Sequence, residues 1–85
     1  MRILYFSWFR TKVGMAEESV TPPPEVTDVA ALVAWLRTRG PAFAEALADP
    51  AVVRVAVNQE YASADAPVGP DDEVALFPPV TGGRP

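Results

Sequence analysis

The chain has 85 residues, 49% of them hydrophobic, so we expect one domain with a single hydrophobic core. Its net charge of −4 disfavours nucleic-acid binding, which requires a clustered basic surface, and suggests that a protein partner would offer a basic rim. The absence of cysteine and histidine removes disulfides, thiolate metal sites and the commonest general base. No apolar run approaches the ~20 residues of a membrane span and residues 1–4 do not resemble a signal peptide, so a soluble cytoplasmic protein is expected.

The first part of the sequence predicts two strands. Residues 3–9 are apolar and rich in aromatic side chains, which is typical of a central strand with both faces at least partly covered. Residues 10–15 predict a turn or a short helix around Gly14. Residues 17–21 form a short polar strand that ends at three prolines, and such a strand belongs at the edge of a sheet.

One amphipathic helix follows these strands. Thr27 is the candidate N-cap, and Asp28 lies in the first turn, where the helix dipole favours a negative charge. Gly40 and the proline after it are expected to end the helix. Arg37 and Arg39 in the last turn would complement the negative end of the helix dipole. The apolar residues recur at i, i+3, i+4 and i+7, and are Val29, Leu32, Val33 and Leu36.

The second half of the sequence predicts a short helix over residues 42–48, which Asp49-Pro50 breaks. Residues 53–57 then read as a strand, and Asn58-Gln59 as a tight turn into a return strand over residues 60–62.

After an irregular stretch, residues 73–77 form the last predicted strand. The order strand, strand, helix, strand, short strand, strand predicts an α+β fold of the β-grasp type, a mixed sheet with one main helix packed on one face. The first and last strands would pair in the middle of this sheet. The three acids Asp71, Asp72 and Glu73 are interpreted as a solvated turn before the last strand rather than as a metal site.

Side-chain alternation predicts what lies on each face of the sheet. Four residues of the first and last strands would face the helix, namely Ile3, Tyr5, Val74 and Leu76. The residues between them would face the other way, namely Leu4, Phe6, Ala75 and Phe77. No second helix is predicted to cover that face, so Phe6, Phe77 and Tyr61 would form an exposed apolar patch of the kind that marks protein interfaces. The alternative is that Phe6 packs into the core and Phe77 is a single exposed aromatic.

Residues 78–85 predict an extended tail beyond a domain of residues 1–77. Proline fixes φ and favours extended geometry, so Pro78-Pro79 should stop the last strand and carry the chain away from the domain. The diglycine Gly82-Gly83 would let the backbone pass through a channel too narrow for a Cβ atom. The tail is therefore interpreted as an arm that reaches into the active site of another protein, with a frayed terminus rich in glycine and proline as the alternative.

Three segments of the sequence resemble the small subunits of molybdopterin synthase, a family of ubiquitin-like β-grasp sulfur carriers. The segments are Tyr-Phe-Ser-Trp-Phe-Arg at 5–10, Ala-Val-Asn-Gln at 56–59, and Asp-Glu-Val-Ala-Leu-Phe-Pro-Pro-Val-Thr-Gly-Gly at 72–83. The resemblance covers nearly the whole chain, and its last segment is the most specific part. A bare diglycine would be weak evidence, because other sulfur carriers and ubiquitin-type modifiers share it.

The resemblance implies a role in molybdenum cofactor biosynthesis. An E1-like adenylyltransferase that uses ATP and Mg²⁺ would adenylate the terminal glycine carboxylate, and a sulfurtransferase would help to convert it to a thiocarboxylate. The tail would then enter the large subunit of molybdopterin synthase, in a heterotetramer, and donate sulfur to the pterin precursor. The chain itself would bind no cofactor and no metal, and would be the sulfur-donating subunit of a transferase complex rather than an enzyme acting alone.

The resemblance also implies roles for single residues. Gly83 would carry the adenylate and then the thiocarboxylate, with Gly82 as its slender neighbour. Arg10 would pair with an acidic residue of the partner, unless it is an ordinary solvated arginine. The residues that would line the partner's channel are Pro78, Pro79, Val80 and Thr81, and those that would form the docking patch are Phe6, Tyr61 and Phe77.

One feature departs from the family pattern. Arg84 and Pro85 follow the diglycine, so the carbonyl of Gly83 is held in a peptide bond and cannot be adenylated directly. Three explanations stay open: a precursor trimmed by a peptidase, which we favour, residues added for expression, or a homologue that kept the fold without the sulfur chemistry.

Three other functions also stay open. The chain could carry sulfur for another pathway, such as thiamine synthesis, cysteine synthesis or tRNA thiolation. It could be a ubiquitin-like modifier joined through Gly83 to lysines of target proteins. It could also be a plain interaction domain, in which case binding would survive loss of the whole tail.

Overall fold

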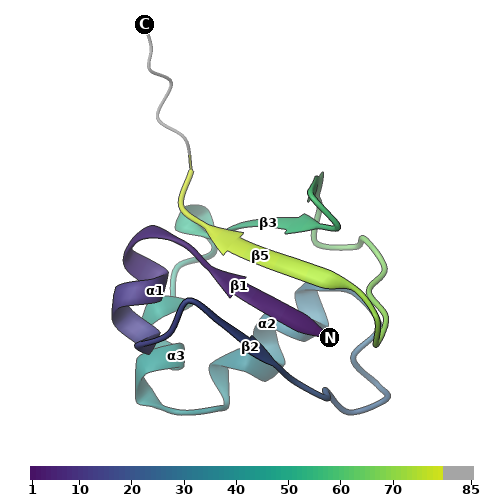
Figure 1. The fold of residues 1–85 in the computed structure, drawn as a ribbon, viewed down its shortest axis with the longest axis horizontal. Helices are drawn as coiled ribbons and strands as arrows, with labels where there is room; N and C mark the ends of the chain where they lie inside the picture. The colour runs from purple at the N-terminus through teal and green to yellow at the C-terminus, as the bar shows by residue number, and fades with distance from the viewer. Residues whose placement is uncertain (80–85) are drawn as a thin grey trace, which may run out of the picture.

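The structure is a computed structural model, and it describes residues 1–79. Figure 1 shows a five-stranded sheet with α2 and α3 behind it and α1 beside one end. The strands are β1 (Arg2–Tyr5), β2 (Glu17–Ser19), β3 (Arg54–Val57), β4 (Glu60–Ala62) and β5 (Glu73–Phe77). The helices are α1 (Ser7–Val13), α2 (Val29–Arg37) and α3 (Pro41–Ala46), and a short 3₁₀ helix, η1, spans Pro50–Val52.

The sheet is mixed, with the strand order β2-β1-β5-β3-β4. The first and last strands, β1 and β5, run parallel at its centre, and the other neighbouring pairs are antiparallel. This topology confirms the β-grasp arrangement, and β2 lies at the edge of the sheet as expected. The prediction that β1 and β5 pair in the middle is also confirmed.

The hydrophobic core lies between the sheet and α2. The side chains predicted to face the helix are at most 2% exposed, and they are Ile3, Tyr5, Val74 and Leu76. Ile3 is the register partner of Val74, and Tyr5 that of Leu76, so these four residues form one block. Leu32 and Leu36 of α2 are fully buried against this core. The predicted alternation of the central strands is therefore confirmed.

The prediction that the first strand runs to residue 9 is wrong. β1 ends at Tyr5, and Ser7 begins α1 with a φ of 54°. Phe9 is 1% exposed because the helix, not a strand, turns its side chain into the core. Gly14 ends α1 in the left-handed conformation, and its N–H donates to the carbonyl of Arg10 over 2.9 Å. A short aromatic run fits a strand and a buried helix equally well, so the sequence pattern alone does not separate them.

The limits of α2 also differ from the expected ones. Asp28, not Thr27, is the N-cap, since its Oδ1 accepts the N–H of Ala31 at 2.8 Å. The helix ends at Arg37 rather than near Gly40, and the Thr38 hydroxyl donates to the carbonyl of Trp35 at 2.6 Å. Of the four apolar positions, Val33 alone is only partly buried. Further along, α3 ends at Ala46, two residues before the predicted limit, and η1 was not predicted.

Arg39 therefore lies outside α2, where it joins a polar network beside the edge strand β2. Glu18 accepts hydrogen bonds from the Tyr5 hydroxyl and from Arg39. Burial raises the pKa of the Tyr5 phenol well above its ordinary value, and the Glu18 carboxylate raises it further. The Tyr5 ring is thus buried in the core while its hydroxyl group hydrogen bonds to Glu18 near the surface.

Within residues 1–79, none of the helices combines the length and the apolar character that crossing a bilayer requires.

Candidate docking surface at the root of the tail

A shallow hollow of about 700 Å³ lies on the sheet face that α2 does not cover, where β5 ends. The three aromatics of the predicted patch meet here, and we call them the aromatic patch: Phe6, Tyr61 and Phe77. Phe6 is 47% exposed and Tyr61 80%, while Phe77 is half-buried. The alternative, that Phe6 packs into the core, does not agree with this exposure. The hollow is lined by Phe6, Ser7, Ala56, Gln59, Tyr61, Ala75, Phe77, Pro78 and Pro79.

Phe6 is held outward by the turn between β1 and α1. Its N–H donates to the carbonyl of Leu76 over 3.1 Å, which keeps it in line with the strand. The next residue, Ser7, has a positive φ that costs a non-glycine residue about 1 kcal/mol. This sharp turn lets Phe9 enter the core three residues later while Phe6 stays on the outer face. The strained backbone of Ser7 therefore lies directly beside the hollow, and strained residues of this kind cluster at functional sites.

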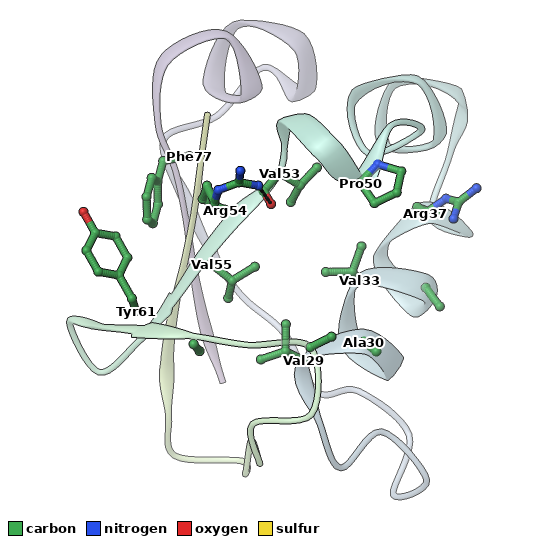
Figure 2. A pocket seen from close by; sticks show the side chains of 13 residues that line it. Val29, Ala30, Val33, Arg37, Pro50, Val53, Arg54, Val55, Tyr61 and Phe77 are labelled. Atoms are coloured by element: carbon green, nitrogen blue, oxygen red, sulfur yellow. Dashed lines mark hydrogen bonds between the residues drawn. The ribbon is translucent and has the colours of Figure 1, made fainter. Parts of the chain in front are cut away.

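Tyr61 is placed by the hairpin that joins β3 to β4. Asn58 and Gln59 have φ values of 52° and 71°, the pair of left-handed residues that a two-residue turn of this type requires. The predicted turn is confirmed. It sets Ala56 opposite Tyr61, and the Tyr61 ring centroid lies 5.7 Å from that of Phe77. Figure 2 shows these two rings beside one another.

The floor of the hollow is made by small side chains. Ala56 of β3 and Ala75 of β5 are register partners, and both point away from α2 because their strand neighbours face it. Sequence reasoning missed Ala56 and Ala75 as site residues. The signal was present, since each alanine alternates with valine or leucine on the opposite, buried face.

Asn58 ties the hairpin to the start of β5. Its amide donates to Asp72 Oδ1 at 3.0 Å, and its Oδ1 accepts the N–H of Glu73 at 3.0 Å. Asp72 also accepts the N–H of Gly69 at 2.8 Å. The hydrogen bond from Asn58 holds the pKa of Asp72 below its usual value, and the bond from Gly69 adds to this. These contacts stiffen the support of Tyr61, and no sequence pattern had indicated them.

Two of the three acidic residues at 71–73, Asp72 and Glu73, make contacts that support the fold. Glu73 forms an exposed ion pair with Arg2 at 3.3 Å, and Asp72 is engaged as described above. Within residues 1–79 there is no cluster of three or more acidic, histidine or cysteine side chains that could hold a metal ion.

Arg10 does not join the hollow. It is exposed on α1 and is not among the residues that line the hollow. It makes no ion pair within residues 1–79. Trp8, an exposed aromatic of α1, also lies outside the lining, and its ring packs against that of Phe9 with the centroids 4.9 Å apart. A contact of Arg10 with a partner stays a prediction.

Pro78 and Pro79 follow β5 directly and form part of the rim of the hollow. The chain thus leaves the sheet beside the aromatic patch. The other predicted tail residues, Val80, Thr81, Gly82 and Gly83, lie outside the described residues, so their roles and the proposed limits of the tail stay predictions.

The family model described as "ThiS family" matches residues 3–83, which include every segment of the resemblance and both tail glycines. The chain belongs to the ThiS family. The chain is also similar to the molybdopterin synthase sulfur carrier subunit of Escherichia coli K12, with 37% identity over 83 residues, which cover 98% of this chain and 99% of the E. coli protein.

Two solved structures share the fold over nearly the full length. One is described as a putative molybdopterin converting factor, subunit 1, from Pyrococcus furiosus, with a TM-score of 0.75 and 31% identity over 93% of this chain and 95% of that one. The other is SAMP1 from Haloferax volcanii, with a TM-score of 0.74 and 25% identity over 98% of each chain. These similarities confirm the ubiquitin-like β-grasp fold.

Proposed function

We propose that this protein is the sulfur carrier subunit of a molybdopterin synthase and acts in molybdenum cofactor biosynthesis. The observation that carries the proposal is the 37% identity, over nearly both full lengths, to the E. coli protein of that name. The geometry is consistent with it, because β5 ends at Phe77 in the aromatic patch and Pro78 and Pro79, which follow, lie on the rim of the same hollow. A carrier of this kind needs a docking surface and a thin arm that starts beside it.

The proposed chemistry takes place at Gly83. A carboxylate is a poor acyl donor, so its oxygen would first attack the α-phosphate of ATP and release pyrophosphate, leaving an acyl adenylate. Hydrosulfide would then displace AMP from the acyl carbon and leave a thiocarboxylate. That sulfur would pass to the pterin precursor in the active site of the large synthase subunit, and water would return the missing carboxylate oxygen to Gly83.

Gly83 needs a free carboxylate before this can happen. In the sequence its carbonyl is bonded to the nitrogen of Arg84, so we propose that a peptidase first hydrolyses this bond. One water is consumed, and the new carboxylate stays on Gly83. The two glycines at the end would leave the carbonyl open to attack from either face.

The partners would supply the catalytic groups. The chain contains no cysteine and no histidine, so a thiol nucleophile or an imidazole base would have to come from elsewhere. An E1-like adenylyltransferase would use ATP and Mg²⁺, and a sulfurtransferase would provide sulfur. The large synthase subunit would then bind the loaded carrier, with two carriers on a dimer of large subunits.

We assign the docking role to the aromatic patch. Large aromatic side chains bury much apolar area at little entropic cost, which makes them frequent anchors of protein interfaces. Phe6 and Tyr61 are exposed, and Phe77, whose ring lies beside that of Tyr61, joins them to the start of the tail. The activating enzyme and the synthase would have to bind in turn, because each needs the same tail.

The proposal is tested with three forms of the chain, ending at Gly82, at Gly83 and at Pro85. Each is incubated with the activating enzyme, ATP, Mg²⁺ and a sulfide source, and its intact mass is measured. We expect only the form ending at Gly83 to exchange one oxygen for sulfur and then to support conversion of the pterin precursor.

The form ending at Gly82 is the matched control for tail length. The proposal would be overturned if the form ending at Gly83 took up no sulfur, or if the form ending at Pro85 supported conversion without cleavage. Efficient sulfur uptake without conversion would assign the carrier to another pathway, and adducts with lysines of other proteins would identify a modifier.

A further inference from the structure

A second hollow, which we call the α2 groove, lies between α2 and the β3–β4 hairpin (Figure 2), and its lining extends to Tyr61 and Phe77 at the edge of the aromatic patch. It has a volume of about 690 Å³ and is lined mostly by apolar side chains. Val29 and Val55 form its buried floor, being 4% and 7% exposed. Figure 2 shows Val33 of α2 and Val55 of β3 pointing toward each other across it.

The groove exists because α2 does not cover the sheet as far as β4. The helix buries Leu32 and Leu36 in the core, and its side next to β4 carries Ala30, Val33 and Ala34. Exposed faces of surface helices usually carry charged residues, but the sequence of α2 has one charge, Arg37. Short side chains on this face leave the space open, and its apolar character leaves area that a ligand can bury.

The charges around the groove are all of one sign. Its lining contains Arg37 and Arg54 and, among the residues that the structure describes, no acidic side chain, although the chain as a whole has a net charge of −4. Neither arginine makes an ion pair within residues 1–79, whereas Arg2, Lys12 and Arg39 do.

Both arginines lie where α2 ends and β3 begins. Figure 2 shows them toward the same end of the groove as Pro50, with Val29 and Ala30 toward the other end. Arg54 donates to the backbone carbonyls of Ala51 and Val53 at 3.2 and 3.4 Å, which keep its guanidinium beside the groove without neutralising it. The groove is therefore apolar along its length and cationic at one end.

The open edge of the sheet borders the same groove. β4 is the last strand in the sheet order, so its outer edge has no strand neighbour within the described part of the chain. Tyr61 and Ala62 of this strand belong to the lining. An extended segment that enters between β4 and α2 could hydrogen bond to this edge while alternate side chains contact the valines below.

We propose that the α2 groove binds an extended segment of a partner protein that carries alternating apolar residues and, at one end, acidic residues that pair with Arg37 and Arg54. Charge complementarity selects this occupant. The chain's own tail is a poorer occupant, because residues 80–85 contain no acidic side chain and Pro78 and Pro79, from which they continue, line the tail-side hollow and not the α2 groove. The site is separate from the floor of the tail-side hollow, although Tyr61 and Phe77 border both.

The test uses the full chain and a fluorescein-labelled peptide of alternating valine and threonine with two aspartates at one end, made with the aspartates at either terminus. Fluorescence polarisation should show saturable binding of at least one version, and replacing the aspartates with lysines should abolish it. Arg37→Gln with Arg54→Gln should weaken binding about ten-fold. The matched control, Arg2→Gln with Lys12→Gln, removes two cations outside the groove and should change it less than about two-fold.

A second pair of variants tests the apolar wall. Ala34→Glu places a carboxylate on the exposed face of α2 inside the groove, and Ala44→Glu does the same on α3 outside it. We expect the first to abolish binding and the second to leave it unchanged, with both proteins unfolding at wild-type temperature by circular dichroism.

Two binding results would overturn the proposal: no saturable binding of either peptide, or an equal loss of peptide affinity in the arginine double variant and in its control. Two further results would also overturn it. One is a concentration-dependent dimer that Ala34→Glu alone disrupts, and the other is peptide binding about ten-fold tighter by a chain ending at Pro79. The dimer would identify a second copy as the occupant, and the tighter binding would identify the chain's own tail.

Discussion

The two faces of the central strands β1 and β5 differ in what covers them. On the α2 side, Ile3, Val74 and Leu76 are fully buried and Tyr5 is 2% exposed. On the other side, the residues that follow Tyr5 and Leu76 contribute to an open aromatic patch: Phe6 is 47% exposed and Phe77 half-buried. Adjacent residues of one strand therefore experience different environments, because each step along a strand changes the face.

This difference separates stability from binding. Apolar area on the α2 face is already removed from water and contributes to folding, whereas apolar area on the other face can contribute only when a partner covers it. Substitutions on the first face should therefore unfold the protein, and those on the second should weaken docking in a folded protein.

The largest effect is expected for Leu76→Ala. Leu76 is fully buried between the sheet and α2, so the truncation should cost about 2 to 5 kcal/mol in the free energy of unfolding. That is a large share of the roughly 5 to 15 kcal/mol typical of a small domain. Urea denaturation followed by circular dichroism measures it. A loss below about 1 kcal/mol would contradict the division between the two faces.

Phe77→Ala, one residue along the strand, should affect docking more than folding. Binding to the large synthase subunit should weaken by about 1 to 3 kcal/mol, as expected for loss of an aromatic anchor. Titration calorimetry measures the affinity. Trp8→Ala removes an exposed aromatic outside the hollow and should leave the affinity unchanged. Equal effects of the two variants would remove the aromatic patch from the interface.

Asn58→Ala tests the support of the patch. The variant loses the bonds to Asp72 and Glu73 and also places a less tolerant residue at positive φ, so about 1 to 2 kcal/mol of stability should be lost. Asn58→Gly keeps the turn conformation and loses only the side-chain bonds, so it should cost less. Thermal unfolding compares the two, and a glycine variant less stable than the alanine variant would rule out the turn as the cause.

The smallest effect at neutral pH is expected for Tyr5→Phe, and it should show in alkaline solution. The folded-state pKa of Tyr5 is raised above the ordinary value of 10.0, so the neutral phenol's contribution is complete below pH 10 and is lost as the pH rises further. The phenylalanine variant should therefore show a shallower decline in unfolding free energy above pH 10. If the unfolding free energy declined equally in both proteins above pH 10, the idea that burial raises the pKa of the Tyr5 phenol would be wrong.

Much of the fold could be predicted because it depends on local patterns. The alternation of β1 and β5 and the turn at Asn58-Gln59 follow from neighbouring residues alone. Phe9 could not be placed, because an aromatic run does not distinguish a strand from a buried helix. The bond from Asn58 to Asp72 and the α2 groove depend on how distant elements pack, which no local pattern specifies.

The most direct test of the central claim is the intact mass of the protein purified from its native cell. We predict a species that ends at Gly83 and carries sulfur in place of one carboxylate oxygen. A mature protein that supports cofactor synthesis while Arg84 remains bonded to Gly83 would contradict the account.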